Sequence, residues 1–255
     1  MNLYYEDVPA TNDETPKLPP LLTAKLINRG IDVEAKAISV AARGEAGVVC
    51  YSEVSDRLDM AITLAPEVKG LDAQQIQFIA MNAVGDAIGA LAPPEVSVSF
   101  RFPGYILLNR GYAGNVKLTF SSSKNNENDI PDWMVVSINI RMDFDGDDHD
   151  LEYKLENTSL SEEGAGFISR TRLLESCSRH FLVWLHQWEE EGFQSIHDEW
   201  IKRVDENKKL RKNDGSEAEF IGLDEQGSGL IKSNDNVVSV SMFDVEKIFG
   251  QQKNF

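Results

Sequence analysis

Apolar and polar residues alternate along several short stretches of the chain, and this period of two is typical of β-strands. Longer stretches instead repeat their apolar residues every three or four positions, which is typical of amphipathic helices. We therefore predict strands at 58–67, 96–100, 106–108, 116–120, 133–142 and 237–240, and helices at 74–91, 170–191 and 195–204.

Two hairpins are predicted where short strands flank a glycine turn. The first spans residues 38–51 and the second spans residues 218–232. Asp72 is a candidate N-cap for the helix at 74–91, and Pro93-Pro94 is expected to end that helix. The charged segment 208–214 is predicted to be a linker.

The composition is that of an ordinary folded protein, with 255 residues of which 42% are hydrophobic and 26% charged. This length predicts one large domain, alone or with a small appendage. The formal net charge of −17 argues against a nucleic-acid partner, because phosphate binding relies on cations. No apolar run reaches the roughly 18–20 residues of a membrane span, and the first residues lack the pattern of a secretory signal. We therefore predict a cytoplasmic protein without a membrane partner.

The two cysteines, Cys50 and Cys177, lack the spacing of metal ligands. In a reducing cytoplasm we expect them to pack as small apolar residues rather than to form a disulfide. The acidic run from Asp143 to Asp150 is similar to a calcium loop but lacks glycine at the sixth position and an acid at the twelfth. No metal ligands are therefore predicted.

A strand in the middle of the chain resembles the Lys-Trp-Pro-Asn-Asp strand of biotin–protein ligases. Arg101 replaces the first lysine, Phe102 replaces the tryptophan, and Pro103 is kept. Tyr112 stands where the family has a second lysine, in a lysine-alanine-glycine segment that ends here at Gly114.

Other motifs follow in the order of the same family. Arg43, Gly44 and Gly47 resemble the arginine- and glycine-rich loop that orders over the acyl-adenylate, although on the residues alone they also fit a common hairpin turn. Asn139 matches the asparagine of a Val-Val-Gly-Ile-Gly-Ile-Asn-Val strand, and residues 158–164 match a Thr-Ser-Leu-X-Glu-Glu-Gly motif. The hairpin at 218–232 resembles the small C-terminal domain of these ligases.

The resemblance implies an α+β fold with a mixed central β-sheet and flanking helices, of the class II synthetase and biotin-ligase type. A small SH3-like β-barrel is expected to follow. The implied organisation is an extended lead-in at 1–28, a biotin/lipoate-ligase-like domain at 29–207 and a C-terminal domain at 208–255.

The resemblance also implies a chemistry: ATP and Mg activate a small carboxylic acid such as biotin, lipoate or octanoate, and a lysine of an acyl-carrier or biotin-acceptor domain receives the acyl group. The charge that develops at the α-phosphate needs a cation. Tyr112 carries no positive charge at neutral pH, so Arg101 and Lys117 are candidates to replace the lost lysine. The candidate catalytic residues are Arg101, Tyr112 and Lys117, and the candidate substrate-binding residues are Arg43, Gly44, Gly47, Phe102, Pro103, Gly114 and Asn139.

The departures from the family pattern leave a second hypothesis open. The lysine of the lysine-alanine-glycine segment, the Asn-Asp pair and two loop arginines are all replaced in this chain. The chain is then a non-catalytic relative that binds a small carboxylate, a nucleotide or an acyl carrier. A homodimer paired through a sheet edge is also open, because members of this superfamily pair in that way.

Overall fold

The computed structural model describes residues 15–52, 56–121, 127–144, 157–234 and 236–250. Its main feature is a seven-stranded mixed sheet in the order β1-β2-β3-β7-β6-β5-β4. β1 runs parallel to β2, and the other neighbours are antiparallel. The strands are β1 (Thr23–Ile27), β2 (Val48–Ser52), β3 (Arg57–Leu64), β4 (Val98–Arg101), β5 (Tyr105–Leu108), β6 (Gly111–Phe120) and β7 (Met134–Arg141).

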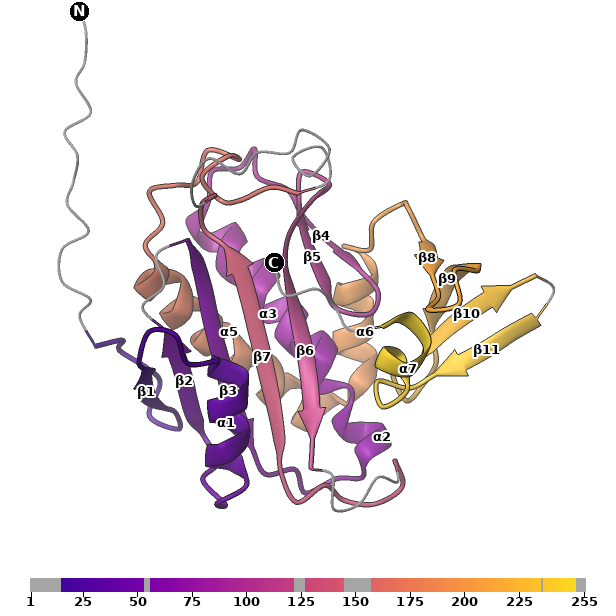
Figure 1. Cartoon of the computed structure of the whole chain (residues 1–255), viewed down its shortest axis with the longest axis horizontal. Coiled ribbons are helices and arrows are strands. Elements are labelled where there is room, and N and C mark those ends of the chain that lie inside the picture. Colours follow the sequence, from indigo (N-terminus) through magenta and orange to yellow (C-terminus); the bar gives the residue numbers. More distant parts are fainter. Residues whose placement is uncertain (1–14, 53–55, 122–126, 145–156, 235, 251–255) are drawn as a thin grey trace, which may run out of the picture.

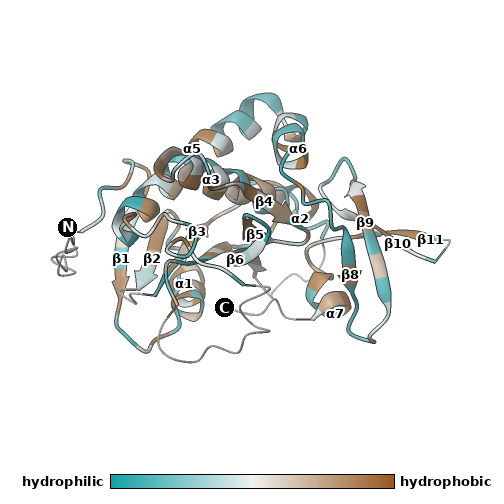
Figure 2. Cartoon of the chain, turned by 90° about the horizontal axis from the view of Figure 1, so that it is seen from above, coloured by the Kyte–Doolittle hydropathy of each residue, from teal (hydrophilic) through white to brown (hydrophobic). Residues whose placement is uncertain are grey.

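Helices cover the two faces of this sheet unequally. One face carries α1 (Val33–Ala41), and the opposite face carries α3 (Ile76–Leu91) and α5 (Arg170–Glu191), which pack against each other, with α5 also contacting β3 (Figures 1 and 2). The short helix α2 (Gly70–Ala73) leads into α3, and α6 (Phe193–Ile201) packs against both α3 and α5. The α1 face is therefore the more open of the two.

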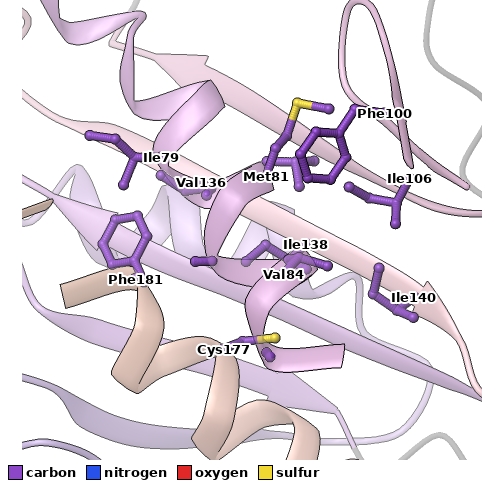
Figure 3. Close-up of a cluster of buried hydrophobic side chains, with 14 of the residues drawn as sticks. Ile79, Met81, Val84, Phe100, Ile106, Val136, Ile138, Ile140, Cys177 and Phe181 are labelled. Atoms are coloured by element: carbon purple, nitrogen blue, oxygen red, sulfur yellow. The ribbon is translucent and has the colours of Figure 1, made fainter. Parts of the chain in front are cut away.

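The main core lies between the sheet and α3. Twelve residues of α3 are buried, because the sheet contacts one side of this helix and α5 contacts the other. Figure 3 shows the α3 side chains Ile79, Met81 and Val84 against Val136, Ile138 and Ile140 of β7, with Cys177 and Phe181 from α5. A second, smaller core joins α1 to the other face and includes Cys50. Both cysteines are buried and apolar in their packing, as predicted.

A second sheet follows α6. It is antiparallel, in the order β11-β10-β9-β8, with strands β8 (Lys209–Arg211), β9 (Glu217–Leu223), β10 (Gly229–Ser233) and β11 (Asn236–Val240). The short helix α7 (Val245–Phe249) comes next and lies on the same side of the large sheet as α1 (Figure 2). The small β unit is thus present, whereas the SH3-like barrel stays a prediction.

The second sheet is joined to the first through aromatic and amide contacts. The ring of Phe102 stacks on that of Phe220 at 5.0 Å between centroids. The Gln74 side chain donates to the carbonyl of Gln226 and to the hydroxyl of Ser228, and it accepts from the backbone N–H of Met242. The Phe102 ring also meets that of Phe249 in α7 at 6.3 Å between centroids, so the same region holds α7 next to the large sheet.

Most predicted elements are confirmed, and three details are wrong. Residues 38–41 are the end of helix α1 rather than a strand, because Val33, Ala37 and Val40 form a buried helical stripe and Asp32 caps the helix by accepting from the N–H of Ala35. Asp72 lies inside α2, and Gln75 occupies the N-cap position of α3. The segment predicted as a charged linker contains the edge strand β8.

Candidate functional site

The open face of the large sheet holds a cavity of about 290 Å³ beside the start of α1. Its floor consists of side chains from four adjacent strands, β2, β3, β7 and β6. The β1–α1 turn and the first turn of α1 form its wall. The polar residues around it are Asp32, Glu34, Ser52, Arg57, Asp59, Asn115, Lys117, Ser137 and Asn139.

Three buried polar atoms in this cavity have no hydrogen-bond partner among the described residues. They are the hydroxyls of Ser52 and Ser137 and the amide oxygen Oδ1 of Asn139. Buried polar groups in folded proteins are nearly always paired, because leaving one unpaired costs about 1–3 kcal/mol. Three such atoms around one cavity are what a binding site for a polar ligand requires.

Asp59 of β3 contributes a half-buried carboxylate to this cavity. Asn139 lies directly across from Asp59 on β7, and its amide nitrogen Nδ2 donates to Oδ1 of Asp59. Burial raises the pKa of Asp59, and the positive charge of Arg57 and the hydrogen bond from Asn139 oppose that rise. The carboxylate therefore sits in a place that disfavours its charge.

Lys117 of β6 stands between this cavity and a second one of about 360 Å³, and it lines both. Its ammonium nitrogen lies 3.3 Å from Glu34 Oε1 of α1 and 2.9 Å from Glu246 Oε1 of α7. Burial lowers the pKa of Lys117, but the hydrogen bonds and charges of Glu246 and Glu34 outweigh this, so that the pKa is raised. Lys117 is therefore protonated at neutral pH.

The second cavity is closed by residues that follow the small sheet. Met242, Phe243, Val245 and Glu246 line one side of it, and Lys117, Thr119 and Phe120 of β6 line the other. The ring of Phe243 stacks on that of Phe120 at 4.1 Å between centroids. The site thus draws on both parts of the chain.

Arg101 and Tyr112 lie together but not in either cavity. Arg101 donates through Nη2 to the Asp205 carboxylate and through Nη1 to the Tyr112 hydroxyl. Its guanidinium also lies 4.8 Å from the centroid of the Tyr112 ring. The side chains of Arg101 and Asp205 are only 14% and 8% exposed, so this ion pair is built into the fold.

The glycine turn after α1 is also distant from the cavities. Arg43 is exposed and donates through Nε to Glu45 at 2.9 Å. Gly44 and Gly47 have positive φ, and a side chain at Gly47 would meet the carbonyl oxygen of Leu21 at 2.8 Å. These glycines shape a turn, and none of the three predicted loop residues lines either cavity.

The remaining predicted residues position strands. The Phe102 ring packs on the second sheet, and the Pro103 carbonyl accepts from Gln77 Nε2 at 3.2 Å. Gly114 lets β6 approach β7, since a side chain there would meet the carbonyl oxygen of Asn139 at 2.1 Å. Of the ten predicted site residues, only Lys117 and Asn139 line the cavities. Sequence reasoning missed Ser52, Asp59 and Ser137, whose only signal is a polar residue within an apolar strand.

Within the described residues, no group of three or more His, Cys, Asp or Glu side chains is arranged to hold a metal ion. Most of the acidic run from Asp143 to Asp150 lies outside those residues. No helix in the described part of the chain is long and apolar enough to cross a membrane.

The fold is that of the biotin protein ligases. A crystal structure of a biotin protein ligase-like protein of unknown function from a Silicibacter species superposes with a TM-score of 0.81 and 31% sequence identity, covering 91% of this chain and 99% of the other. Biotin protein ligase from Aquifex aeolicus superposes with a TM-score of 0.66 and 16% identity, covering 86% of this chain and 96% of the other.

The sequence places the chain more narrowly. The model of the biotin/lipoate A/B protein ligase family matches residues 18–202, and the chain belongs to this family. It is 23% identical to the bifunctional ligase/repressor BirA of Bacillus spizizenii over 210 residues, which are 81% of this chain and 63% of that protein. It is 25% identical to the biotin–[acetyl-CoA-carboxylase] ligase of Paracoccus denitrificans over 146 residues, which are 56% of this chain and 58% of that protein. The matches thus span about three fifths of these two relatives.

Proposed function

We propose that this chain binds a small carboxylic acid in the 290 Å³ cavity and activates it with ATP, as a divergent ligase of its family. The observation that carries the proposal is the position of Lys117, whose cation lines both cavities of the open face. A cation at such a junction faces the acid on one side and the α-phosphate of a nucleotide in the second cavity on the other. There it stabilises the charge that develops on the phosphate.

The other residues of the face have separate roles in this proposal. Ser52, Ser137 and Asn139 hold the end of the acid that lies away from its carboxylate, because their buried atoms lack partners. Glu34 and Glu246 fit the one or two carboxylates that hold magnesium at nucleotide sites, and magnesium would neutralise phosphate charge there. The acid carboxylate displaces pyrophosphate from ATP to form the acyl-adenylate, and the amine of a lysine on a carrier or biotin-acceptor domain then takes the acyl group and releases AMP. The Aquifex aeolicus ligase has been crystallised with biotin and ATP, which supports the pairing of these two ligands.

The test is a search for the acyl-adenylate. Purified protein is incubated with ATP, magnesium and, separately, biotin, lipoate and octanoate, and the products are analysed by mass spectrometry. We expect an adenylate with one of the acids. We also expect Lys117→Met to lower its rate of formation by about 10²–10³, as for the loss of a group that stabilises transition-state charge.

The matched control is Lys209→Met, which removes an exposed lysine of β8. It should leave adenylate formation unchanged. No adenylate from folded protein with any acid, or equal rates for Lys117→Met and wild type, would contradict the proposal.

A second candidate function is supported by the pairing of the cations. Glu34 and Glu246 neutralise Lys117, and Asp205 engages Arg101, so neither cation is held ready for a phosphate. The chain is then a non-catalytic relative that binds a small ligand. Saturable binding of an acid by calorimetry, without adenylate in the screen, would establish this function. The cytoplasmic location and the homodimer stay predictions.

A further inference from the structure

The end of the cavity near Asn139 presents hydrogen-bond acceptors. The Nδ2 donor of Asn139 is used by Asp59, so the atom of Asn139 without a partner is the acceptor Oδ1. The carboxylate of Asp59 is also an acceptor. The nearby hydroxyls of Ser52 and Ser137 can accept or donate. A ligand group that satisfies this end must therefore carry several N–H donors.

The charge at this end calls for a cation rather than a neutral amide. Asp59 is half-buried and hydrogen-bonded to a neutral amide, while Arg57, whose positive charge offsets part of its negative charge, donates to Asp56 at 3.1 Å. A buried carboxylate is strongly favoured by a hydrogen-bonded cation and only weakly by a neutral partner. Burial raises the pKa of Asp59 even though the positive charge of Arg57 opposes that rise, so Arg57 does not fully offset the cost of the charged carboxylate.

A positive charge of the cavity, on Lys117, lies across the sheet from Asp59. Lys117 on β6 pairs with Ser137 of β7, whereas Asp59 on β3 pairs with Asn139 of β7. All four side chains line the cavity. Asp59 and Lys117 are thus two strand spacings, or about 10 Å, apart across the sheet. They are also offset by two residues along the strand direction. A straight-chain acid of about eight carbons spans a distance of this order.

We propose that Asp59 is a specificity-determining residue and that the ligand is a carboxylic acid whose far end carries a cationic nitrogen group, such as an amine or a guanidine. Ser52, Ser137 and Asn139 accept its remaining N–H groups, and its carboxylate points to Lys117. This inference rests on the proposed acid-binding function of the cavity and narrows the class of acid.

The experiment compares two acids that differ only in the terminal amine. Octanoate and ω-aminooctanoate are titrated calorimetrically into wild-type protein and into Asp59→Asn, which keeps the shape of the side chain and removes its charge. We expect wild type to bind ω-aminooctanoate about tenfold or more tightly than octanoate, the usual effect of a charge-assisted hydrogen bond. We expect Asp59→Asn to lose this preference.

Asp198→Asn is the matched control, because it makes the same change at an exposed position of α6. It should keep the preference, and thermal melting checks that both variants are folded. Biotin is titrated in parallel.

The outcomes separate this inference from the proposed function. Tighter binding of octanoate or biotin than of ω-aminooctanoate, or an amine preference that survives in Asp59→Asn, overturns the inference and leaves the acid site in place. Absence of binding by all three acids overturns the acid site and the inference together.

Discussion

At the scale of single residues, the charged carboxylate of Asp59 lowers the stability of the ligand-free protein, whereas in our proposal it strengthens ligand binding. The pKa of Asp59 is raised from 3.8, mainly by burial. The folded protein therefore binds this proton more tightly than the unfolded chain does. Well below pH 3.8 the group is neutral in both states, and as the pH rises through the folded-state pKa the cost of the half-buried charge appears in full.

We expect Asp59→Asn to raise the melting temperature of the ligand-free protein at pH 7, since it removes that buried charge. The gain should shrink as the pH falls towards and below 3.8, where wild-type Asp59 becomes protonated in both states. Melting curves from pH 3.5 to 7 measure this difference. A variant less stable than wild type at pH 7 would show that the Asp59 carboxylate stabilises the empty cavity.

The thiol of Cys177 allows a second test at this scale. Its complete burial in α5 raises its pKa to about 12, so almost no thiolate exists at neutral pH. We expect a thiol reagent to leave Cys177 unmodified in the folded protein and to modify it fully in denaturant. Peptide mapping by mass spectrometry distinguishes it from Cys50, and rapid native labelling of Cys177 would mean that α5 opens readily.

At the scale of elements, we expect the same substitution, glycine to alanine, to have opposite effects on stability at two positions. Gly229 begins β10, and a methyl group there would lie 2.4 Å from Cζ of Phe102. Gly89 lies in α3, with open space around the same position. We expect Gly229→Ala to destabilise the protein by about 1–3 kcal/mol through overpacking. We expect Gly89→Ala to stabilise it by about 0.5–1 kcal/mol through helix propensity.

Denaturant unfolding of the two variants measures both values with the same chemical change. Equal effects of one sign would show that the Phe102 ring moves aside for a methyl group, and the stacked contact with Phe220 would then be looser than its 5.0 Å separation indicates.

The long helices and most strands were predictable because their hydrophobic period is strong over many residues. The helix α5 spans Arg170–Glu191, as the spacing predicts. The nine-residue helix α1 was missed because Ile38 and Val40 favour strands and alternate with small residues, so the local period misleads. Its identity depends on the Asp32 cap and on burial against the sheet.

The site was less predictable than the fold, for a topological reason. Ser52, Asp59 and Ser137 become neighbours only because β7 inserts beside β3 in the sheet order. Their separation along the chain gives no signal of this. Asn139 was found from the resemblance and Lys117 as a cation close to the replaced lysine, whereas Arg101 and Tyr112 proved to be bound to each other and, through Arg101, to Asp205.

At the scale of the whole molecule, the two sheets share one hydrophobic core. Phe220, Ile231 and Val240 of the small sheet belong to the same buried cluster as α3 and β7. Neither sheet can separate from the other without exposing that core, so the two sheets should unfold together.

We therefore expect one calorimetric transition for the whole chain, with equal calorimetric and van't Hoff enthalpies. Phe220→Ala should still unfold in a single transition, and its free energy of unfolding should be lower by about 3–5 kcal/mol, the usual cost of deleting a buried ring. Two resolved transitions in the variant or in wild type would show that the sheets unfold separately.

The reach of Glu246 from α7 to Lys117 also orders events during synthesis. The strands that carry Lys117 and Asn139 are translated before Met242, Phe243 and Glu246, which complete the second cavity only once they too have left the ribosome. A nascent chain therefore lacks the complete two-cavity site until Glu246 has emerged, and a chain that stops before Glu246 has the sheet without that site.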